Sequence, residues 1–136
     1  MKLTSVREIK SELLSRQASL ESLQVWTEKL PLPSESLNLL ILDEEREIAR
    51  LQVELDAATS ELSEEIKSRV TNAAQQTILI LRYVDCLSFQ EVALRSRYSE
   101  SNCYRLHRKG KAAYEAEVLF GASYGVAGDG RRGVDN

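Results

Sequence analysis

Two prolines, Pro31 and Pro33, are the only ones in the chain, and they interrupt a long stretch of helical periodicity in its N-terminal half. Proline lacks a backbone N–H and disfavours helical geometry in the residue before it, so a helix is expected to stop near Leu30. Elsewhere aromatic residues are scarce, and five of the six glycines lie after residue 120. This composition favours helix over sheet, and we expect an all-α protein.

The stretches on either side of the prolines carry apolar residues at helical spacing. The stripe residues are Val6, Ile9, Leu13, Leu20, Leu23 and Leu30 before the break, and Leu37, Ile41, Ile48, Leu51, Leu55, Leu62 and Ile66 after it. The second stripe keeps a heptad-like repeat to about Arg69. Because the connection is short, we expect an N-terminal antiparallel helical hairpin, coiled-coil-like, over residues 1–70.

Local signals mark where these two helices begin. Thr4 or Ser5 can accept from the first free amides, and Glu8 stands where the reciprocal member of a capping box belongs. Ser34 or Ser36 can cap the second helix. The hairpin is expected to be either a passive spacer or a surface for a partner, with a homodimer through the N-terminal helices as one candidate.

Charge is distributed unevenly along the chain. Residues 1–70 carry nine Lys/Arg against fourteen Asp/Glu, whereas residues 71–114 carry seven against three, a net charge of +4. Cations near a phosphate backbone release condensed counterions, so a basic segment in an acidic chain suits contact with nucleic acid. A solvated basic face without a partner explains the same charges equally well.

From Thr71 the pattern changes to three shorter helical units. The first carries an apolar stripe that ends around residues 85–87 and consists of Ala74, Ile78, Leu81 and Val84. Ser88 and Glu91 then predict a capping box at the start of a second helix. Ser99 is expected to cap a third helix that runs to about Ala116. Two short helices joined by a tight connection, the second one basic, indicate a helix-turn-helix over residues 71–118.

Packing between the second and third of these helices is expected to use Val92 and Ala93 against Cys103 and Leu106. The opposite face of the third helix then meets solvent and carries side chains suited to a major groove. The residues predicted to bind DNA are Ser99, Glu100, Ser101, Asn102, Tyr104, Arg105, Arg108 and Lys109.

Individual roles follow from the chemistry of these side chains. Arg105 can pair bidentately with guanine and Asn102 with adenine. Arg108 and Lys109 can hold phosphates. An ordinary helical hairpin with a hydrophilic outer face is the plainer alternative.

Four segments carry a resemblance to a known family: residues 80–85 (ILRYVD), 88–93 (SFQEVA), 98–101 (YSES) and 104–108 (YRLHR). Together they resemble the C-terminal domain of small phage-encoded transcriptional regulators. That family is similar to region four of bacterial sigma factors and to late-gene activators of the RinA and ArpU type. The resemblance covers about forty residues, and it implies a phage or prophage protein that binds double-stranded DNA and acts on transcription, with RNA polymerase of the bacterial host as a candidate partner.

Position by position, the resemblance assigns DNA contact to Glu100, Ser101, Asn102, Tyr104 and Arg105, and phosphate support to Ser99 and Arg108. The chain departs from the family pattern at Ser96 and Arg97, where the family has a large apolar residue and then glycine. It also departs at Gly110 and Lys111, and we expect this to weaken the packing of the third helix near its end.

Other classes of function find little support in the sequence. Cys86 and Cys103 are expected to be small buried hydrophobes, and with His107 alone they make a zinc site improbable. His107 is expected to pack or to form a hydrogen bond. No nucleophile, base and orienting group stand together, so neither an enzyme nor a cofactor is predicted. With no secretory or membrane segment found, the expected location is the bacterial cytoplasm.

Two alternatives to a transcription regulator remain. A DNA-packaging protein such as a small terminase subunit also joins a helix-turn-helix to helical oligomerisation segments. A sigma-like adaptor could instead bind polymerase or another regulator without touching DNA. The last part of the chain, residues 119–136, is predicted to be a disordered tail because it has almost no large apolar side chain.

Overall fold

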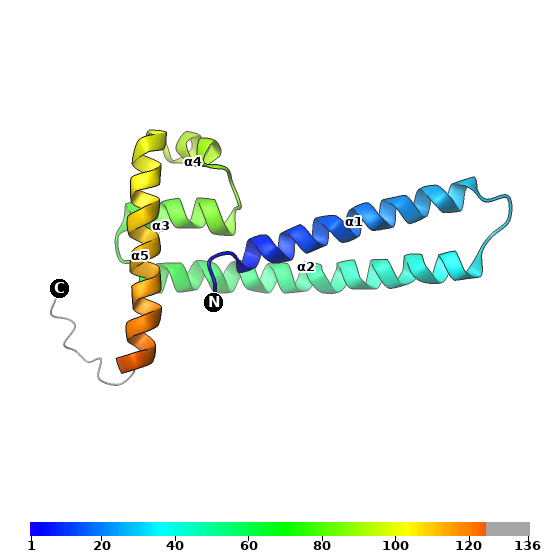
Figure 1. The fold of residues 1–136 in the computed structure, drawn as a ribbon, viewed down its shortest axis with the longest axis horizontal. Coiled ribbons are helices and arrows are strands. Elements are labelled where there is room, and N and C mark those ends of the chain that lie inside the picture. Colours follow the sequence, from blue (N-terminus) through cyan, green and yellow to red (C-terminus); the bar gives the residue numbers. More distant parts are fainter. Residues whose placement is uncertain (125–136) are drawn as a thin grey trace. The chain divides into compact units, whose positions relative to one another are not determined.

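The computed structural model describes residues 1–124, with side chains as far as Ala116 (Figure 1). The described residues form α1 (Ser5–Lys29), α2 (Glu35–Arg69), α3 (Ala73–Leu79), the π-helical turn η1 (Ile80–Val84), α4 (Phe89–Ser96) and α5 (Glu100–Tyr124). They contain no strand, so the expected all-α class is confirmed for this part of the chain. The chain divides into two compact units, Met1–Leu62 and the residues from Ser63 onward.

The first unit consists of α1 and the first part of α2, which run antiparallel in Figure 1. Leu13 and Leu51, one from each predicted stripe, are buried. Arg16 of α1 donates from Nη1 to Oε2 of Glu44 on α2 at 3.1 Å, which adds a partly buried ion pair. As predicted, α1 ends just before Leu30, whose backbone is extended.

The starts of the two long helices differ in how well the sequence predicts them. Ser34 caps α2, because its hydroxyl accepts the Leu37 N–H at 3.2 Å. The capping box predicted for α1 is wrong. Thr4 lacks the extended backbone of a typical N-cap, and its hydroxyl donates to Glu8 Oε2 at 3.0 Å instead of accepting from an amide. The alternative cap, Ser5, donates to the Lys2 carbonyl at 2.6 Å.

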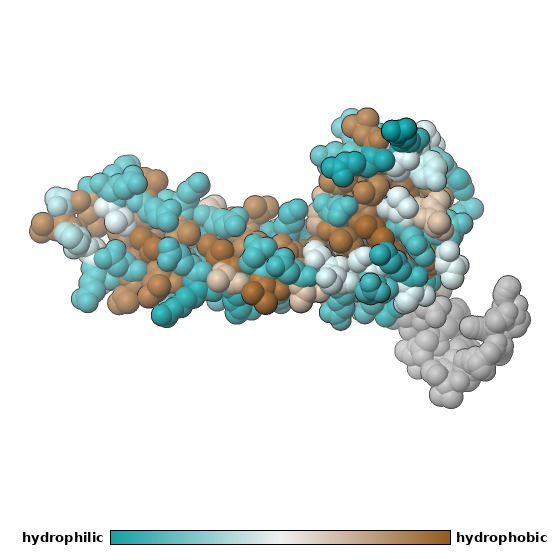
Figure 2. All heavy atoms as spheres, turned by 180° about the vertical axis from the view of Figure 1, so that it is seen from behind, coloured by the Kyte–Doolittle hydropathy of each residue, from teal (hydrophilic) through white to brown (hydrophobic). Residues whose placement is uncertain are grey.

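Apolar side chains also reach the surface of the first unit, among them Trp26, which is 61% exposed. The other large exposed apolar residues of this unit are Leu14, Val25, Leu30, Leu32, Leu39, Leu40, Leu42 and Val53. In Figure 2 such side chains lie among hydrophilic ones along the hairpin. Large apolar side chains are therefore exposed on the hairpin as well as buried within it.

The second unit combines the last turns of α2, from Ser63, with α3, η1, α4 and α5. The boundary between the units therefore falls within α2, whereas the sequence suggested a division at residue 70. Tyr114 of α5 donates its hydroxyl to Glu65 Oε1 at 2.8 Å, and its ring lies 4.7 Å from the Arg69 guanidinium carbon. These contacts pack α5 against the end of α2.

Helix α5 crosses α3 closely at Gly110, which is buried. A Cβ atom at this position would lie 3.2 Å from the Gln75 Cβ and 3.2 Å from two side-chain atoms of Leu79. Gly110 therefore allows the two helices to approach. Helix α5 continues past the expected end near Ala116 to Tyr124, so the predicted disorder is wrong for residues 119–124, while residues 125–136 lie outside the described part.

The helical unit that starts with α3 ends where the sequence predicted, around residues 85–87, but its last turn is a π-helical turn that the sequence did not predict. In η1 the amide of Asp85 donates to the carbonyl of Ile80 at 2.9 Å, a π-helical bond. Cys86 then adopts a φ of 58°, in the left-handed region. The helical path therefore stops here, and the chain turns into α4.

Candidate nucleic-acid interface

The first helix of the candidate interface is α4, and side-chain hydrogen bonds cap its N-terminus. Ser88 and Glu91 make the predicted capping box, in which Ser88 Oγ accepts the Glu91 N–H at 3.2 Å and Glu91 Oε1 accepts the Ser88 N–H at 2.9 Å. The hydrogen bonds from the Ser88 backbone and hydroxyl hold the pKa of Glu91 below its ordinary value. This motif fixes where α4 starts.

The connection between α4 and α5 turns sharply at Arg97, which has a φ of 70° and a ψ of 14°. Its amide donates to the Ala93 carbonyl at 2.9 Å, and the next amide, of Tyr98, donates to Ser96 Oγ at 3.3 Å. Left-handed geometry at a non-glycine residue costs about 1 kcal/mol. The chain thus makes this left-handed turn with an arginine and not with a glycine.

Ser99 caps α5, as the sequence predicted. Its hydroxyl accepts the Asn102 N–H at 3.1 Å, and its carbonyl accepts the Cys103 N–H at 2.9 Å. The first turn of α5 is therefore held at two successive residues, and the side chains on its outer side start from a fixed backbone.

The inner side of this helix pair forms a small apolar core. Val92 of α4 and Cys103 of α5 are fully buried, and Leu106 is 7% exposed. Ile78 of α3 completes this cluster, against which Ala93 packs. The predicted packing of α4 on α5 is confirmed, and it decides which face of α5 is turned outward.

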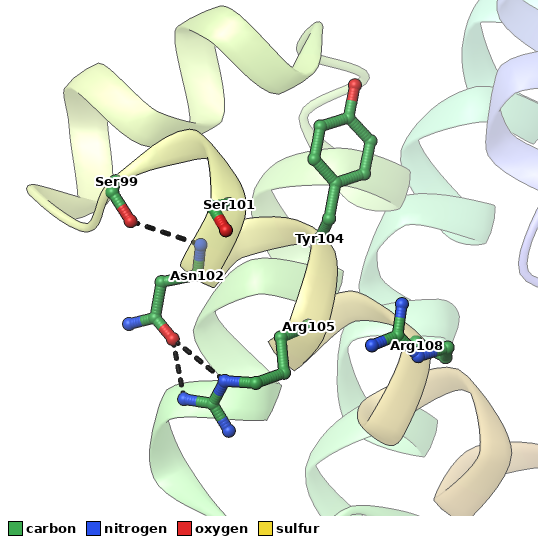
Figure 3. Close-up of a pocket in the computed structure, with 6 residues that line it drawn as sticks. All are labelled: Ser99, Ser101, Asn102, Tyr104, Arg105 and Arg108. Atoms are coloured by element: carbon green, nitrogen blue, oxygen red, sulfur yellow. Dashed lines mark hydrogen bonds between the residues drawn. The ribbon is translucent and has the colours of Figure 1, made fainter.

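An open hollow of about 600 Å³ lies on the outward face (Figure 3). It is lined by Ser99, Ser101, Asn102, Tyr104, Arg105 and Arg108. These are six of the eight residues that the sequence predicted to bind DNA. The other two, Glu100 and Lys109, are exposed but do not line the hollow.

Within the hollow, two side chains contact each other. Arg105 donates from Nε and Nη2 to the single side-chain oxygen of Asn102, at 3.1 and 2.5 Å (Figure 3). Among the described residues, no carboxylate forms an ion pair with Arg105, Arg108 or Lys109. Their positive charges are therefore not neutralised within this part of the chain.

An aromatic cluster supports the hollow from the side of α4. Tyr104, 48% exposed, stacks on Phe89 with ring centroids 4.2 Å apart, and the Arg82 guanidinium carbon lies 4.5 Å from the Phe89 centroid. His107 meets the same Phe89 ring edge-on at 5.1 Å, and its Nε2 lies 2.6 Å from the Tyr83 hydroxyl.

This cluster confirms the expected hydrogen-bonding role of His107. The sequence did not point to Arg82 or Phe89 as supports for Tyr104. The spacing of Tyr104 and His107, three residues apart on one helix, is the signal that could have indicated a shared aromatic neighbour.

Two other features, a metal site and a membrane span, concern the part of the chain that the structure describes. No group of three His, Cys, Asp or Glu residues is placed to hold a metal ion there. Nor does any helix in this part combine the length and apolar character that crossing a membrane requires. Cys103 is buried and Cys86 partly buried, both as free thiols. Comparison of the chain with protein families, curated proteins and solved structures gives no match.

Proposed function

We propose that this chain is a DNA-binding regulator of transcription in which α4 and α5 form a helix-turn-helix. In this arrangement α5 enters the major groove of double-stranded DNA and α4 lies across it, as in sigma region four. Two features support the assignment: a short α4 joined to α5 by a three-residue turn, and a shared apolar core.

The observation that carries the proposal is the outward face of α5. It brings hydroxyl, amide, phenol and guanidinium groups around one hollow, and its cations lack carboxylate partners among the described residues. Groups of these kinds contact base edges and phosphates in protein–DNA complexes.

The resemblance of residues 80–108 to phage-encoded regulators supports a role in transcription within a phage or prophage. In sigma factors, region four also meets RNA polymerase, and we propose polymerase as a second partner. The net charge of +4 on residues 71–114 suits the DNA component of such a complex.

For the hairpin we propose a second copy of this chain as the partner. The large apolar side chains exposed on this unit, Trp26 among them, are surface that a second copy would cover. Mass measurement in solution should give a dimer, and Trp26→Glu should shift it toward the monomer. A large ring would instead favour a packaging protein of the small terminase type.

DNA binding is tested by titrating labelled duplexes, enriched from a random pool, with the whole protein at about 50 and 200 mM salt. For two to four phosphate contacts, the affinity should fall about 10- to 150-fold between these conditions. Arg108→Ala should reduce the salt slope by about 1. Arg46→Ala removes an exposed cation of α2 and serves as the matched control.

Two results would contradict the proposal. One is an affinity that does not change with salt. The other is an equal loss for Arg46→Ala and Arg108→Ala, which would mean that the face of α5 is not the site. If the protein is retrieved with polymerase from a nuclease-treated lysate but binds no duplex, an adaptor role is favoured instead.

A further inference from the structure

Asn102 and Arg105 lie one helical turn apart on α5 and are joined through a single oxygen. Asn102 Oδ1 accepts from Arg105 Nε at 3.1 Å and from Nη2 at 2.5 Å (Figure 3). The backbone of Asn102 is itself held, because its amide donates to the capping hydroxyl of Ser99. The guanidinium group is therefore fixed relative to the start of the helix.

A guanidinium group is planar and has two edges that can donate two parallel hydrogen bonds. Asn102 occupies the edge formed by Nε and Nη2. The edge formed by Nη1 and the second Nη2 hydrogen stays available for a ligand. That edge matches two acceptors on one base, and in the major groove O6 and N7 of guanine present such a pair.

This arrangement changes the role of Asn102. To read adenine, an asparagine must accept from N6 with its oxygen while it donates to N7 with its amide. In Asn102 that oxygen already serves both donors of Arg105. The residue can therefore orient Arg105 or read a neighbouring adenine, and its geometry favours the first.

We propose that Asn102 and Arg105 act as one recognition unit for the guanine of a single G·C base pair. Arg105 contacts the base, and Asn102 is a positioning residue that reads no base of its own. The inference rests on the proposed function, since it requires α5 in the major groove. Because the guanidinium is already ordered, less side-chain freedom is lost when DNA binds.

A double-mutant cycle on the enriched duplex tests the coupling. Arg105→Ala should reduce the preference for one guanine by roughly 5- to 150-fold. Asn102→Ala should reduce the preference at the same base pair, and the double variant should lose no more than Arg105→Ala alone. Replacement of that guanine by 7-deazaguanine removes the N7 acceptor but keeps O6, so it should reduce the difference between wild type and Arg105→Ala.

The conservative variant Asn102→Asp separates positioning from base reading. It keeps an oxygen acceptor for Arg105 but removes the amide donor that adenine needs. We expect it to retain the guanine preference, although its negative charge lowers the affinity for all duplexes. Asn38→Ala, which removes an exposed asparagine side chain of α2, is the matched control and should leave the preference unchanged at that base pair.

A measurement without DNA examines the Asn102–Arg105 contact itself. The Nε–H resonance of Arg105 in the NMR spectrum of the whole protein should shift in Asn102→Ala and stay near its wild-type position in Asn102→Asp. If the Arg105 Nε–H resonance does not shift in Asn102→Ala, the inference is overturned. The control variant Asn38→Ala should leave this resonance in place.

The DNA experiments keep failure of the inference apart from failure of the proposed function. If wild type binds duplex DNA with the expected salt dependence but the two substitutions act independently on different base pairs, only the inference is overturned. If wild type binds no duplex at all, the proposed function is overturned and the inference with it.

Discussion

Ser88 and Glu91 hold each other at the start of α4, the hydroxyl accepting one backbone amide at 3.2 Å and the carboxylate the other at 2.9 Å. Removal of this hydroxyl in Ser88→Ala should lower the free energy of unfolding by about 0.5–2 kcal/mol. Ser60→Ala, on an exposed position of α2, should change it by less than about 0.5 kcal/mol. Chemical unfolding followed by helicity measures both, and equal effects would show that the cap has no special role.

The same pair predicts a dependence of stability on pH. Hydrogen bonds from Ser88 hold the pKa of Glu91 in the folded chain below its ordinary value of 4.5. The folded state therefore gains stability above 4.5 and loses it as the pH falls through the lower, folded pKa. The stability difference between wild type and Glu91→Gln should be largest at neutral pH and shrink on acidification through this window. A constant difference would contradict the assignment.

Leu106 and Leu94 offer a matched test of which faces of α4 and α5 are turned inward. Leu106 is 7% exposed in the core between the helices, whereas Leu94 is 80% exposed on α4. Leu106→Ala should cost about 2–5 kcal/mol of unfolding free energy. Leu94→Ala should cost less than about 0.5 kcal/mol, and the reverse order would mean that the faces are assigned wrongly.

Gly110 is expected to tolerate no large side chain. Its Cβ position lies 3.2 Å from the Cβ of Gln75, which is tied to the backbone of α3 and cannot swing aside. Gly110→Leu should therefore lower the unfolding free energy by about 1–3 kcal/mol through overpacking. The control, Ala112→Leu, adds the same side chain at an exposed position of α5. Comparable stability of the two variants would show that α3 and α5 do not approach as described.

Part of this structure could be predicted because the deciding interactions are local. The break at Pro31, the caps at Ser34, Ser88 and Ser99, and the inward turn of Val92 follow from neighbouring residues alone. The same reasoning failed at Thr4 because a capping box also needs an extended backbone at its first residue. The backbone torsion angles of Thr4 cannot be derived from the pattern of residue types alone.

The remaining features depend on residues far apart in the sequence or on side-chain orientation. Phe89 contacts Tyr104 only when α4 packs on α5. The need for a glycine at position 110 likewise depends on the close approach of α3 to α5. The set of residues at the site could be predicted, because the packing of α4 against α5 leaves one face of α5 exposed. The contact that turns Asn102 toward Arg105 could not, since periodicity carries no rotamer information.

The most direct test of the central claim is a titration of the isotope-labelled protein with duplex DNA, followed through its backbone amide resonances. We expect the largest shift changes in residues 99–109 of α5, with smaller ones in α4. Unchanged resonances in residues 99–109 at saturating DNA, or changes confined to α1 and the first part of α2, would contradict the claim that α5 carries the DNA-binding face.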